Sequence, residues 1–491
     1  MKLDDLPVGW VMASNDELGE FVNGAAFKPA DWGDEGVPIV RIQNLTNPTR
    51  QYNKTLRKVD DRYNLENGDI LVSWSATLDV FIWSGHHAYV NQHIFKVIPS
   101  PNMNKRFIFY ALKLTIAELL KSEHLHGTTM KHINRKPFLA HPVPIPPLNE
   151  QHRIAEKLDT LFARLEKGEE AVRAVQKSLT LYRQSVLKAA VSGALTADWR
   201  AERAGQLEHG DDLLKCILKK RREKWECRGK YKEPTVPDTS DLPDLPEEWV
   251  WASVDQIAMI MGGLTKNGKR KDLPLTRPML RVANVYQNRL ELDDIHQSGV
   301  TETELKRVTL ETRDILVVEG NGSKDQIGRM AVWSDEIPNA VHQNHLIKIR
   351  LLEKTLAEFL VTWFQSVLGR KAVEKVASST SGLYTLSISK ISAMVVPLPS
   401  EDEVDAIMTQ VGEAHSKVDV LERWCETELK RSASLRQSIL KDAFSGKLVE
   451  QNPNDEPASE LLARITAEKS TKAKPAKKTS MKKKTVRKTS A

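Results

Sequence analysis

A long internal duplication constrains the fold of this chain more than any other feature of its sequence. Residues 183–193 (RQSVLKAAVSG) return as residues 436–446 (RQSILKDAFSG), with eight of eleven residues identical. Residues 6–14 (LPVGWVMAS) likewise return as residues 245–253 (LPEEWVWAS). Solenoid repeats are about 20–50 residues long, so a repeat of this size indicates a duplicated half-protein.

The two copies match in short islands along most of their length. Between the islands the residues differ freely, which indicates one fold with two different surfaces, because loops tolerate variation and often carry recognition. We therefore expect the two halves to contact two similar targets. The further matching pairs are residues 38–44 with 278–284, 69–72 with 314–317, 93–96 with 345–348, and 144–146 with 397–399.

Each half is followed by the apolar periodicity of a long helix. Residues four and three positions apart form an a/d seam, the pattern by which helices pack on one another. Asn149 matches an N-cap, Ser400 and Glu403 match a capping box, and Gly193 and Gly446 match helix ends. Helices of this size would be about 60 Å long, and we expect them to pack together. The seam residues are Ile154, Leu158, Leu161, Leu165, Val172, Val175, Leu179, Tyr182 and Val186, and then Val404, Ile407, Val411, Ala414, Val418, Leu421, Cys425, Leu435 and Ile439.

A polar connector lies between the two halves. Residues 211–228 are helical in character and include the basic run at 219–222, and prolines at 234, 237 and 243 predict an extended linker after them. The basic run is interpreted first as a solvated helix face, with a DNA contact as the alternative.

The charge of the chain is concentrated at its C-terminus. Of the net +7, residues 466–491 contribute ten Lys and Arg against one Glu, which leaves −2 for the rest. A nucleic-acid-binding surface must therefore be local. We expect the Lys-rich end to be disordered, acting either as a DNA-attracting or as a merely solubilising tail.

Several classes of protein are disfavoured by composition. There is no apolar run long enough to span a membrane and no signal-peptide pattern at the N-terminus. The three cysteines show no CxxC spacing. A cytoplasmic protein without a membrane span is expected.

No motif in the sequence indicates an active site. Residues 263–269 resemble the start of a P-loop, but Arg270 stands where the Mg²⁺-binding Ser or Thr is needed. The histidine pairs at 86–87 and at 124 and 126 lack partners at ligand spacing. The Asn-Pro-Pro-aromatic motif of amino-methyltransferases is absent. We expect neither catalytic residues nor a metal site in this chain.

Four segments, in an order that the second half repeats, resemble a known family. They are residues 91–97 (NQHIFKV), 127–133 (GTTMKHI), 143–154 (VPIPPLNEQHRI) and 183–188 (RQSVLK). The chain resembles the specificity (S) subunits of Type I restriction-modification systems over residues 1–450.

The resemblance implies an α+β fold with two similar globular target recognition domains, joined by two long helices that form an antiparallel coiled coil. The expected parts are recognition domain 1 at 1–147, the first spacer helix at 148–193, a basic polar linker at 194–242, recognition domain 2 at 243–399, the second spacer helix at 400–446, and a Lys-rich low-complexity tail at 447–491, which is expected to be disordered.

The resemblance also implies a function without catalysis. Such subunits bind double-stranded DNA and two modification (methyltransferase) subunits, which carry S-adenosylmethionine and methylate adenine N6. Restriction subunits join through the complex, which uses ATP and Mg²⁺ to translocate and cut DNA. No cofactor is expected on this chain itself. Because the halves share a fold but not a surface, the expected target is split and asymmetric, with a spacer read only by length.

Two other functions remain open on the residues alone. One is a stand-alone duplicated DNA-binding protein, which would bind DNA specifically without partners. The other is a coiled-coil scaffold with two protein-binding heads. Copurifying subunits would distinguish the first from the family function, and salt-dependent duplex binding would distinguish the second.

The candidate DNA contacts are polar residues at the ends of expected strands, because Arg and Lys read guanine and Asn and Gln read adenine in the major groove. Residues shared by both halves, such as Arg41/Arg281 and Asn44/Asn284, have a structural or phosphate-binding role as the alternative. Trp10 and Trp249 are expected in the core. The second half departs from the family pattern at 342–346, 378–384 and 401–403. The candidates are Arg41, Gln43, Asn44, Ser73, Ser75, Gln92, His93, Thr128, Thr129 and Lys131, and in the second half Arg281, Asn284, Asn321, Ser323, Lys324, Gln343, Asn344, Ser379, Ser381 and Tyr384.

Overall fold

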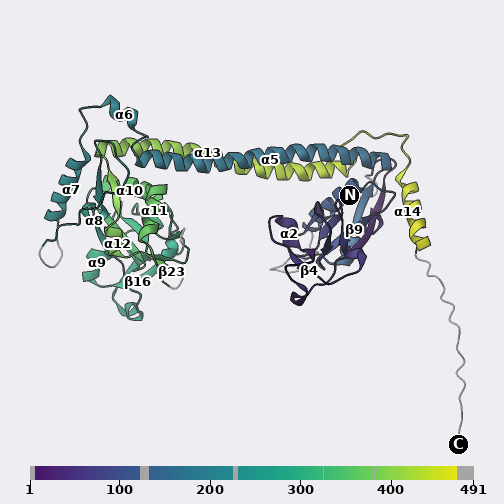
Figure 1. Ribbon diagram of the computed structural model, residues 1–491, viewed down its shortest axis with the longest axis horizontal. Coiled ribbons are helices and arrows are strands. Elements are labelled where there is room, and N and C mark those ends of the chain that lie inside the picture. The colour runs from purple at the N-terminus through teal and green to yellow at the C-terminus, as the bar shows by residue number, and fades with distance from the viewer. Residues whose placement is uncertain (1–5, 122–131, 225–230, 324–325, 381–382, 473–491) are drawn as a thin grey trace, which may run out of the picture. The chain divides into compact units, whose positions relative to one another are not determined.

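The computed structural model shows an α+β chain with two β-rich domains, each packed on a segment of two long helices (Figure 1). It describes residues 6–121, 132–224, 231–323, 326–380 and 383–472. The chain divides into two compact units, Met1–Val172 with Glu426–Ala491, and Arg173–Cys425. We call these the first and second units and describe each by itself.

The domain of the first unit contains two four-stranded sheets and a short antiparallel ribbon. The first sheet is antiparallel, and the second includes one parallel pair, β3 with β8. The first sheet has the spatial order β2 (Gly19–Asn23), β9 (Ile94–Pro99), β6 (Ile70–Ser73) and β7 (Asp79–Ile82). The second sheet has the order β4 (Asn53–Thr55), β3 (Val37–Val40), β8 (Ala88–Val90) and β5 (Asn64–Leu65). The ribbon consists of β1 (Val11–Ser14) and β10 (Pro142–Ile145). The helices are α1 (Asn15–Leu18), α2 (Ile42–Thr46), α3 (Lys105–Leu119) and α4 (Arg135–Leu139).

The domain of the second unit repeats this plan and adds strands to it. Its main sheet β12-β21-β17-β19 corresponds to β2-β9-β6-β7, and the ribbon β11–β24 corresponds to β1–β10. The strands are β12 (Ala258–Gly262), β21 (Leu346–Leu351), β17 (Ile315–Val318), β19 (Met330–Val332), β16 (His296–Val300), β13 (Leu275–Leu280), β20 (Val341–His342), β14 (Val285–Tyr286), β15 (Arg289–Leu290), β18 (Gly320–Asn321), β23 (Leu383–Thr385), β22 (Ser378–Thr380), β11 (Val250–Ser253) and β24 (Val395–Leu398). The helices are α8 (Val254–Ile257), α9 (Glu302–Val308), α10 (Ala357–Gln365), α11 (Val367–Val376) and α12 (Ile388–Ser392).

The two long helices are α5 (Leu148–Val191) and α13 (Glu401–Ala443), and they pack against each other within each unit. In the first unit Ser432 Oγ donates to Glu169 Oε1 at 2.7 Å, and in the second Arg183 Nη2 donates to Asp419 Oδ1 at 2.7 Å. Residue numbers therefore rise along one helix and fall along the other, which makes the pair antiparallel. The seam residues that are buried are Ile154, Leu158, Leu179, Val186, Val404, Ile407, Val411, Val418 and Cys425.

Four residues predicted to lie in the seam are exposed instead. Val175, Tyr182, Leu421 and Leu435 expose 40%, 51%, 44% and 45% of their surface. A strict 4–3 spacing drifts relative to 3.6 residues per turn, so some apolar residues turn onto the flank of the helix. The seam prediction is wrong at these positions.

A buried tryptophan–glutamate hydrogen bond fixes each domain on a long helix. Trp10 Nε1 donates to Glu150 Oε2 at 2.9 Å, and Trp249 Nε1 donates to Glu403 Oε2 at 2.8 Å. Both indoles are buried, which confirms the prediction that they belong to the core. Burial raises the pKa of Glu150.

The predicted starts of the two helices need correction. Asn149 lies inside α5, where its amide donates to Asp455 Oδ1 at 3.1 Å, so it is not the N-cap. Ser400 Oγ does accept from the backbone N–H of Glu403 at 3.4 Å. The Glu403 carboxylate, however, binds Trp249 and Thr196, so the capping box forms only in part.

The expected linker contains a helix that packs into the second unit. In α7 (Gly210–Glu223), Leu213 and Ile217 are buried in the core of that unit. The Gly210 N–H donates to the Glu248 carbonyl at 2.7 Å. Arg221 Nη2 donates to Asp255 Oδ1 at 2.7 Å. The sequence predicted the helix but not this packing.

The basic run of α7 binds carboxylates of the protein itself. Lys220 lies 2.7 Å from Glu353, and Arg221 pairs with Asp255. Arg222 pairs with Glu233. The two interpretations of the basic run, a solvated helix face and a DNA contact, both stay predictions.

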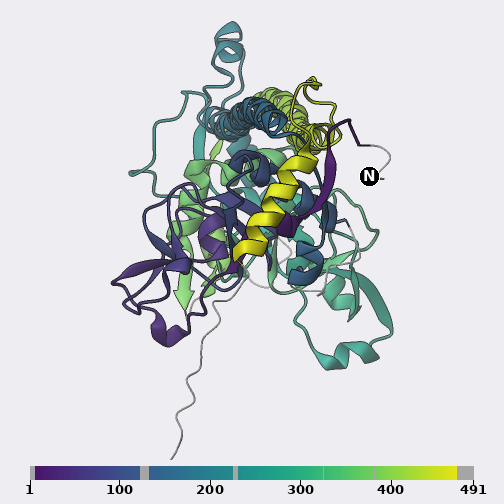
Figure 2. The same cartoon turned by 90° about the vertical axis from the view of Figure 1, so that its right-hand side faces the viewer.

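The prediction of a low-complexity tail is wrong for α14 (Ala458–Lys472), which packs on the first unit (Figure 2). Ala458, Leu461 and Ile465 are buried, because their spacing of three and four gives the helix one apolar face. The Ala458 N–H donates to the Gly9 carbonyl at 2.9 Å, and Lys469 donates to the Asp16 carbonyl. Residues 473–491 lie outside the described residues.

Helix α7 contacts the second domain in the same way as helix α14 contacts the first domain. Gly9 and Glu248 stand at matching positions of the duplicated segment, as do Asp16 and Asp255. Each domain is therefore closed by a helix that follows the long helix of the other half of the sequence.

Candidate nucleic-acid interface

In the first domain the structure brings together candidate residues from separate loops. Arg41 and Gln43 stand at the junction of β3 and α2, and His93 lies in the turn between β8 and β9. All three line one cavity of about 330 Å³, together with Thr46 and Thr77. Three more residues complete its lining, Ile42, Ala76 and Asn91. Two further candidates, Ser75 and Gln92, are sequence neighbours of lining residues.

The Arg41 side chain is oriented by an aromatic ring. Its guanidinium carbon lies 4.8 Å from the centroid of the Trp32 ring. Within the described residues no carboxylate lies within ion-pair distance of Arg41. A guanidinium that stacks on an indole keeps its donors free in its own plane.

Three predicted DNA contacts are enclosed by the protein instead. Asn44 and Asn284 are 2% and 3% exposed, and their Oδ1 atoms accept from the backbone N–H of Arg41 and Arg281 at 3.1 and 2.8 Å. Their amides donate to carbonyls of the following loops. Ser73 is fully buried, and its Oγ donates to the Thr77 carbonyl at 2.6 Å. We withdraw these residues from the proposed interface, because their polar groups hold turns.

In the second domain a small sheet collects candidates from distant segments. Asn321 in β18 pairs with Tyr384 in β23, and Tyr384 pairs with Ser379 in β22. The Ser323 N–H donates to Asn321 Oδ1 at 2.9 Å, which fixes the turn after β18. One row across this sheet, labelled at β23 in Figure 1, therefore carries three candidate positions.

Arg281, the equivalent of Arg41, has a different environment. Its Nη2 lies 2.7 Å from Asp294 Oδ2, so its charge is neutralised by a carboxylate. Gln343 and Asn344 are half-buried in the turn between β20 and β21. His345, which corresponds to His93, lies 3.3 Å from Glu319.

Some candidates cannot be placed. Ser379 is described by its backbone alone. Five more lie outside the described residues: Thr128, Thr129, Lys131, Lys324 and Ser381.

The sequence did not point to several groups that the structure places at these surfaces. Trp32, Thr46 and Thr77 belong to the surroundings of Arg41. In the second domain the guanidinium carbons of Arg289 and Arg329 lie 5.2 and 5.1 Å from the centroid of the Tyr286 ring. No periodic pattern in the sequence reveals such contacts.

Each domain also contains a lysine–aspartate pair, in which a lysine of β9 or β21 faces the aspartate just before β6 or β17. Lys96 in β9 lies 2.9 Å from Asp69, and Lys348 in β21 lies 4.0 Å from Asp314. Burial lowers the pKa of Lys348 to about 8. Lys348 donates to the carbonyls of Arg307 and Thr309, each at 2.8 Å. These pairs stabilise the framework and do not reach the candidate surfaces.

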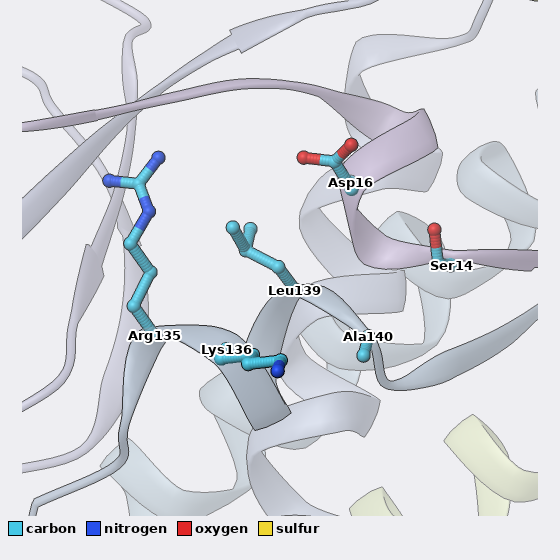
Figure 3. A pocket seen from close by; sticks show the side chains of 6 residues that line it. All are labelled: Ser14, Asp16, Arg135, Lys136, Leu139 and Ala140. Carbon is cyan, nitrogen blue, oxygen red and sulfur yellow. The ribbon is translucent and has the colours of Figure 1, made fainter.

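The first unit has a larger depression of about 570 Å³, lined by Asp16 of α1 and by Arg135 and Lys136 of α4 (Figure 3). Arg135 is held there by the Phe21 carbonyl at 3.0 Å and by the ring of Phe95. None of the DNA contacts predicted from the sequence is among the described residues that line this depression, whereas Arg41, Gln43 and His93 line the other cavity.

None of the helices described is both long and apolar enough to cross a membrane. The described residues contain no group of three or more His, Cys, Asp and Glu side chains placed to hold a metal ion.

Comparisons with known proteins agree on one family. Residues 7–172 match the Type I restriction modification DNA specificity domain. The chain is similar to the Type I restriction enzyme EcoBI specificity subunit of Escherichia coli, with 26% identity over 94% of this chain and 92% of that protein. It is also similar to the EcoKI specificity subunit of Escherichia coli (strain K12), with 26% identity over 96% of this chain and 97% of that protein.

A solved structure supports the same fold. It comes from a study of complex assembly and conformational transition of the type I R-M system, and its TM-score with this chain is 0.60 at 15% identity. The match covers 90% of this chain and 99% of the other. At this identity the likeness shows the fold alone.

Proposed function

The chain belongs to the specificity subunits of Type I restriction-modification systems, and we propose that each of its two domains reads one half of a split, asymmetric DNA site. As the DNA specificity subunit it is a non-catalytic member of such a system. The observation that carries the proposal is the contrast at one duplicated position. Arg41 lines an open cavity, whereas Arg281 is paired with Asp294.

The contrast argues for two unlike half-sites. The frameworks that position the two arginines are equivalent, because in both domains the arginine N–H donates to the asparagine three residues later. The groups offered to DNA on this framework differ, so the same base sequence would not satisfy both domains. A palindrome would require identical surfaces.

We assign the spacing between the half-sites to the long helices. The α5 and α13 pair is continuous in sequence through both units and contains no recognition loop. In the proposed function, the length of these helices sets the number of unread base pairs between the half-sites. Lengthening both helices would change the spacer and leave the half-sites as they are.

A face of the helix pair in the second unit suits a protein partner. Successive residues of an α-helix are turned by about 100°, so Tyr182 and Arg183 flank the line of buried Leu179 and Val186 on opposite sides. On α13, Leu421 and Glu422 flank the line of Val418 and Cys425 in the same way.

The two flanks of this segment have opposite character. Arg183 binds Asp419 and Glu422 on one flank. The other flank presents Tyr182, Leu421 and Trp424, of which Trp424 is 52% exposed. Exposed apolar groups gathered on one face indicate an interaction surface. We propose that a modification subunit docks on this apolar flank.

The proposed complex carries its chemistry on the other subunits. The modification subunits would hold S-adenosylmethionine and methylate adenine N6, and the restriction subunits would use ATP and Mg²⁺. This chain would contribute DNA recognition and the docking surfaces.

A methylation map tests the proposed function. N6-methyladenine is mapped genome-wide in cells that carry this chain with its modification subunit, and in cells that lack this chain alone. We expect a split motif with two unlike half-sites that disappears when the chain is removed. A motif that persists without the chain would refute the proposal.

A further inference from the structure

We infer that Arg41 reads a guanine of the first half-site and that Trp32 is the positioning residue that holds its guanidinium for this contact. The inference rests on the proposed function, because it assumes that the first domain reads DNA. It assigns one base identity to one side chain.

The arrangement around Arg41 limits the freedom of its side chain. Arg41 follows β3 directly, and its backbone N–H is fixed by Asn44 at 3.1 Å. At its other end the guanidinium lies over the Trp32 ring at 4.8 Å. An arginine held at both ends loses little conformational entropy when it binds, and its planar fork stays available.

The chemistry of the cavity favours a base edge over a phosphate. Among the described residues, Arg41 is the one Lys or Arg that lines this cavity of about 330 Å³. The neighbouring polar groups include an amide and two hydroxyls, from Gln43, Thr46 and Thr77. Guanine presents two acceptors, O6 and N7, on one edge in the major groove, and these match the two parallel donors of a guanidinium.

The duplication provides a matched control. Arg281 stands at the equivalent position but binds Asp294 at 2.7 Å, and no ring is found over its guanidinium within the described residues. We expect Arg281 to stabilise its own loop and not to read a base.

The experiment uses the full-length chain in the complete modification complex. Methylation maps are compared for the wild type, Arg41→Gln, Arg41→Lys and Arg281→Gln. We expect Arg41→Gln to lose a guanine preference of roughly 5- to 150-fold at one position of the first half-site. Arg41→Lys should keep only part of this preference, because a lysine can donate to guanine but has no planar pair of parallel donors. The second half-site should not change. Arg281→Gln should leave the base preferences of both half-sites unchanged.

Two variants test the positioning role of Trp32. Its Nε1 is buried and has no hydrogen-bond partner in the described structure, so Trp32→Phe keeps a stacking surface without losing a hydrogen bond. We expect Trp32→Phe to retain the guanine preference and Trp32→Ala to weaken it at the same position as Arg41→Gln. A merely structural tryptophan would lower methylation of all sites without altering base preference.

Several results would overturn the inference. It fails if Arg41→Lys keeps the full guanine preference, or if Arg41→Gln lowers methylation equally for every sequence, as loss of a phosphate contact would. It also fails if Arg41→Gln changes no position. If instead the motif is independent of the whole chain, the proposed function fails and not this assignment alone. Thermal unfolding of each variant shows whether a loss of methylation comes from loss of folding.

Discussion

Trp10 and Trp249 stand at the same position of the two domains and make the same hydrogen bond to a buried glutamate of a long helix, at 2.9 and 2.8 Å. Arg41 and Arg281 also stand at the same position, yet one stacks on Trp32 and the other binds Asp294. The two pairs of residues show which contacts stay the same in both halves of the duplicated chain. Contacts that close each domain on its helices are retained, whereas the groups at the recognition turns have diverged.

The largest predicted effect on stability comes from removing α14, which contacts the first domain as α7 contacts the second. Removal of residues 458–491 should destabilise the first unit by about 3–6 kcal/mol, because three buried apolar side chains leave its core. Removal of residues 473–491 is the control and should leave the unfolding temperature unchanged. Thermal unfolding of the two truncated chains checks this, and equal behaviour would show that α14 is not part of the domain.

The two tryptophan–glutamate pairs should respond unequally. Glu403 also accepts from Thr196 at 2.7 Å, whereas Trp10 is the one donor found for the Glu150 carboxylate in the described structure. Trp10→Phe should therefore cost about 2–3 kcal/mol and Trp249→Phe about 1 kcal/mol, because only the first leaves a buried carboxylate without a donor. Urea unfolding of both variants measures the difference, and a larger loss for Trp249→Phe would contradict it.

The apolar flank is present on the helix pair in the second unit, and the equivalent position in the first unit lacks its large aromatic residue. The duplicated segment has Ala171 where α13 has the exposed Trp424. Trp424→Ala should weaken binding of a modification subunit about tenfold, the effect of losing a central aromatic anchor, with little change in stability. Titration of the purified chain with that subunit measures it. Thr409→Ala, an exposed site on the same helix, should bind normally, and unchanged binding by Trp424→Ala would place the docking surface elsewhere.

The smallest effect concerns acid stability of the second domain. Hydrogen bonding from Arg270 at 2.7 Å lowers the pKa of Glu304 from 4.5 to about 2, with Thr301 contributing. The folded pKa is depressed, so this carboxylate stabilises the fold above pH 4.5 and the stabilisation disappears as the pH falls towards 2.

Glu304→Gln should thus lose about 1–2 kcal/mol at pH 7 and approach the wild type at low pH. Unfolding measured across this pH range checks the sign. An ion pair in the first domain, Arg57 with Asp31, has a more exposed arginine, at 50% against 17% for Arg270. Asp31→Asn should therefore have a weaker effect, and a stronger one would contradict the comparison.

The sequence predicted the framework because the duplication and the apolar periodicity are properties of the chain itself. The long helices, the helix at 210–223 and the buried positions of Trp10 and Trp249 follow from them. It did not predict the packing of α7 and α14, because each presents a short apolar stripe inside a highly charged segment. The exposed flank at Tyr182 was missed because a 4–3 spacing does not show how far each residue turns from the seam.

The candidate interface was predicted less well than the fold. Residue type placed Arg41, Gln43 and His93 among the candidates, and the structure brings them to one cavity. Residue type also selected Asn44, whose amide instead bonds to loop carbonyls. Whether an arginine is stacked on Trp32 or paired with Asp294 depends on contacts across loops, which no pattern of residues reveals.

Removing the polar groups of one cavity and mapping both half-sites tests whether each domain reads its own half-site. The chain with Arg41→Ala, Gln43→Ala and His93→Ala is expressed with its modification subunit, and N6-methyladenine is mapped genome-wide. We predict that base preferences of the first half-site relax, while the second half-site and the spacer length stay as in the wild type. Unchanged preferences in both half-sites, or equal loss from both, would contradict the assignment of one half-site to each domain.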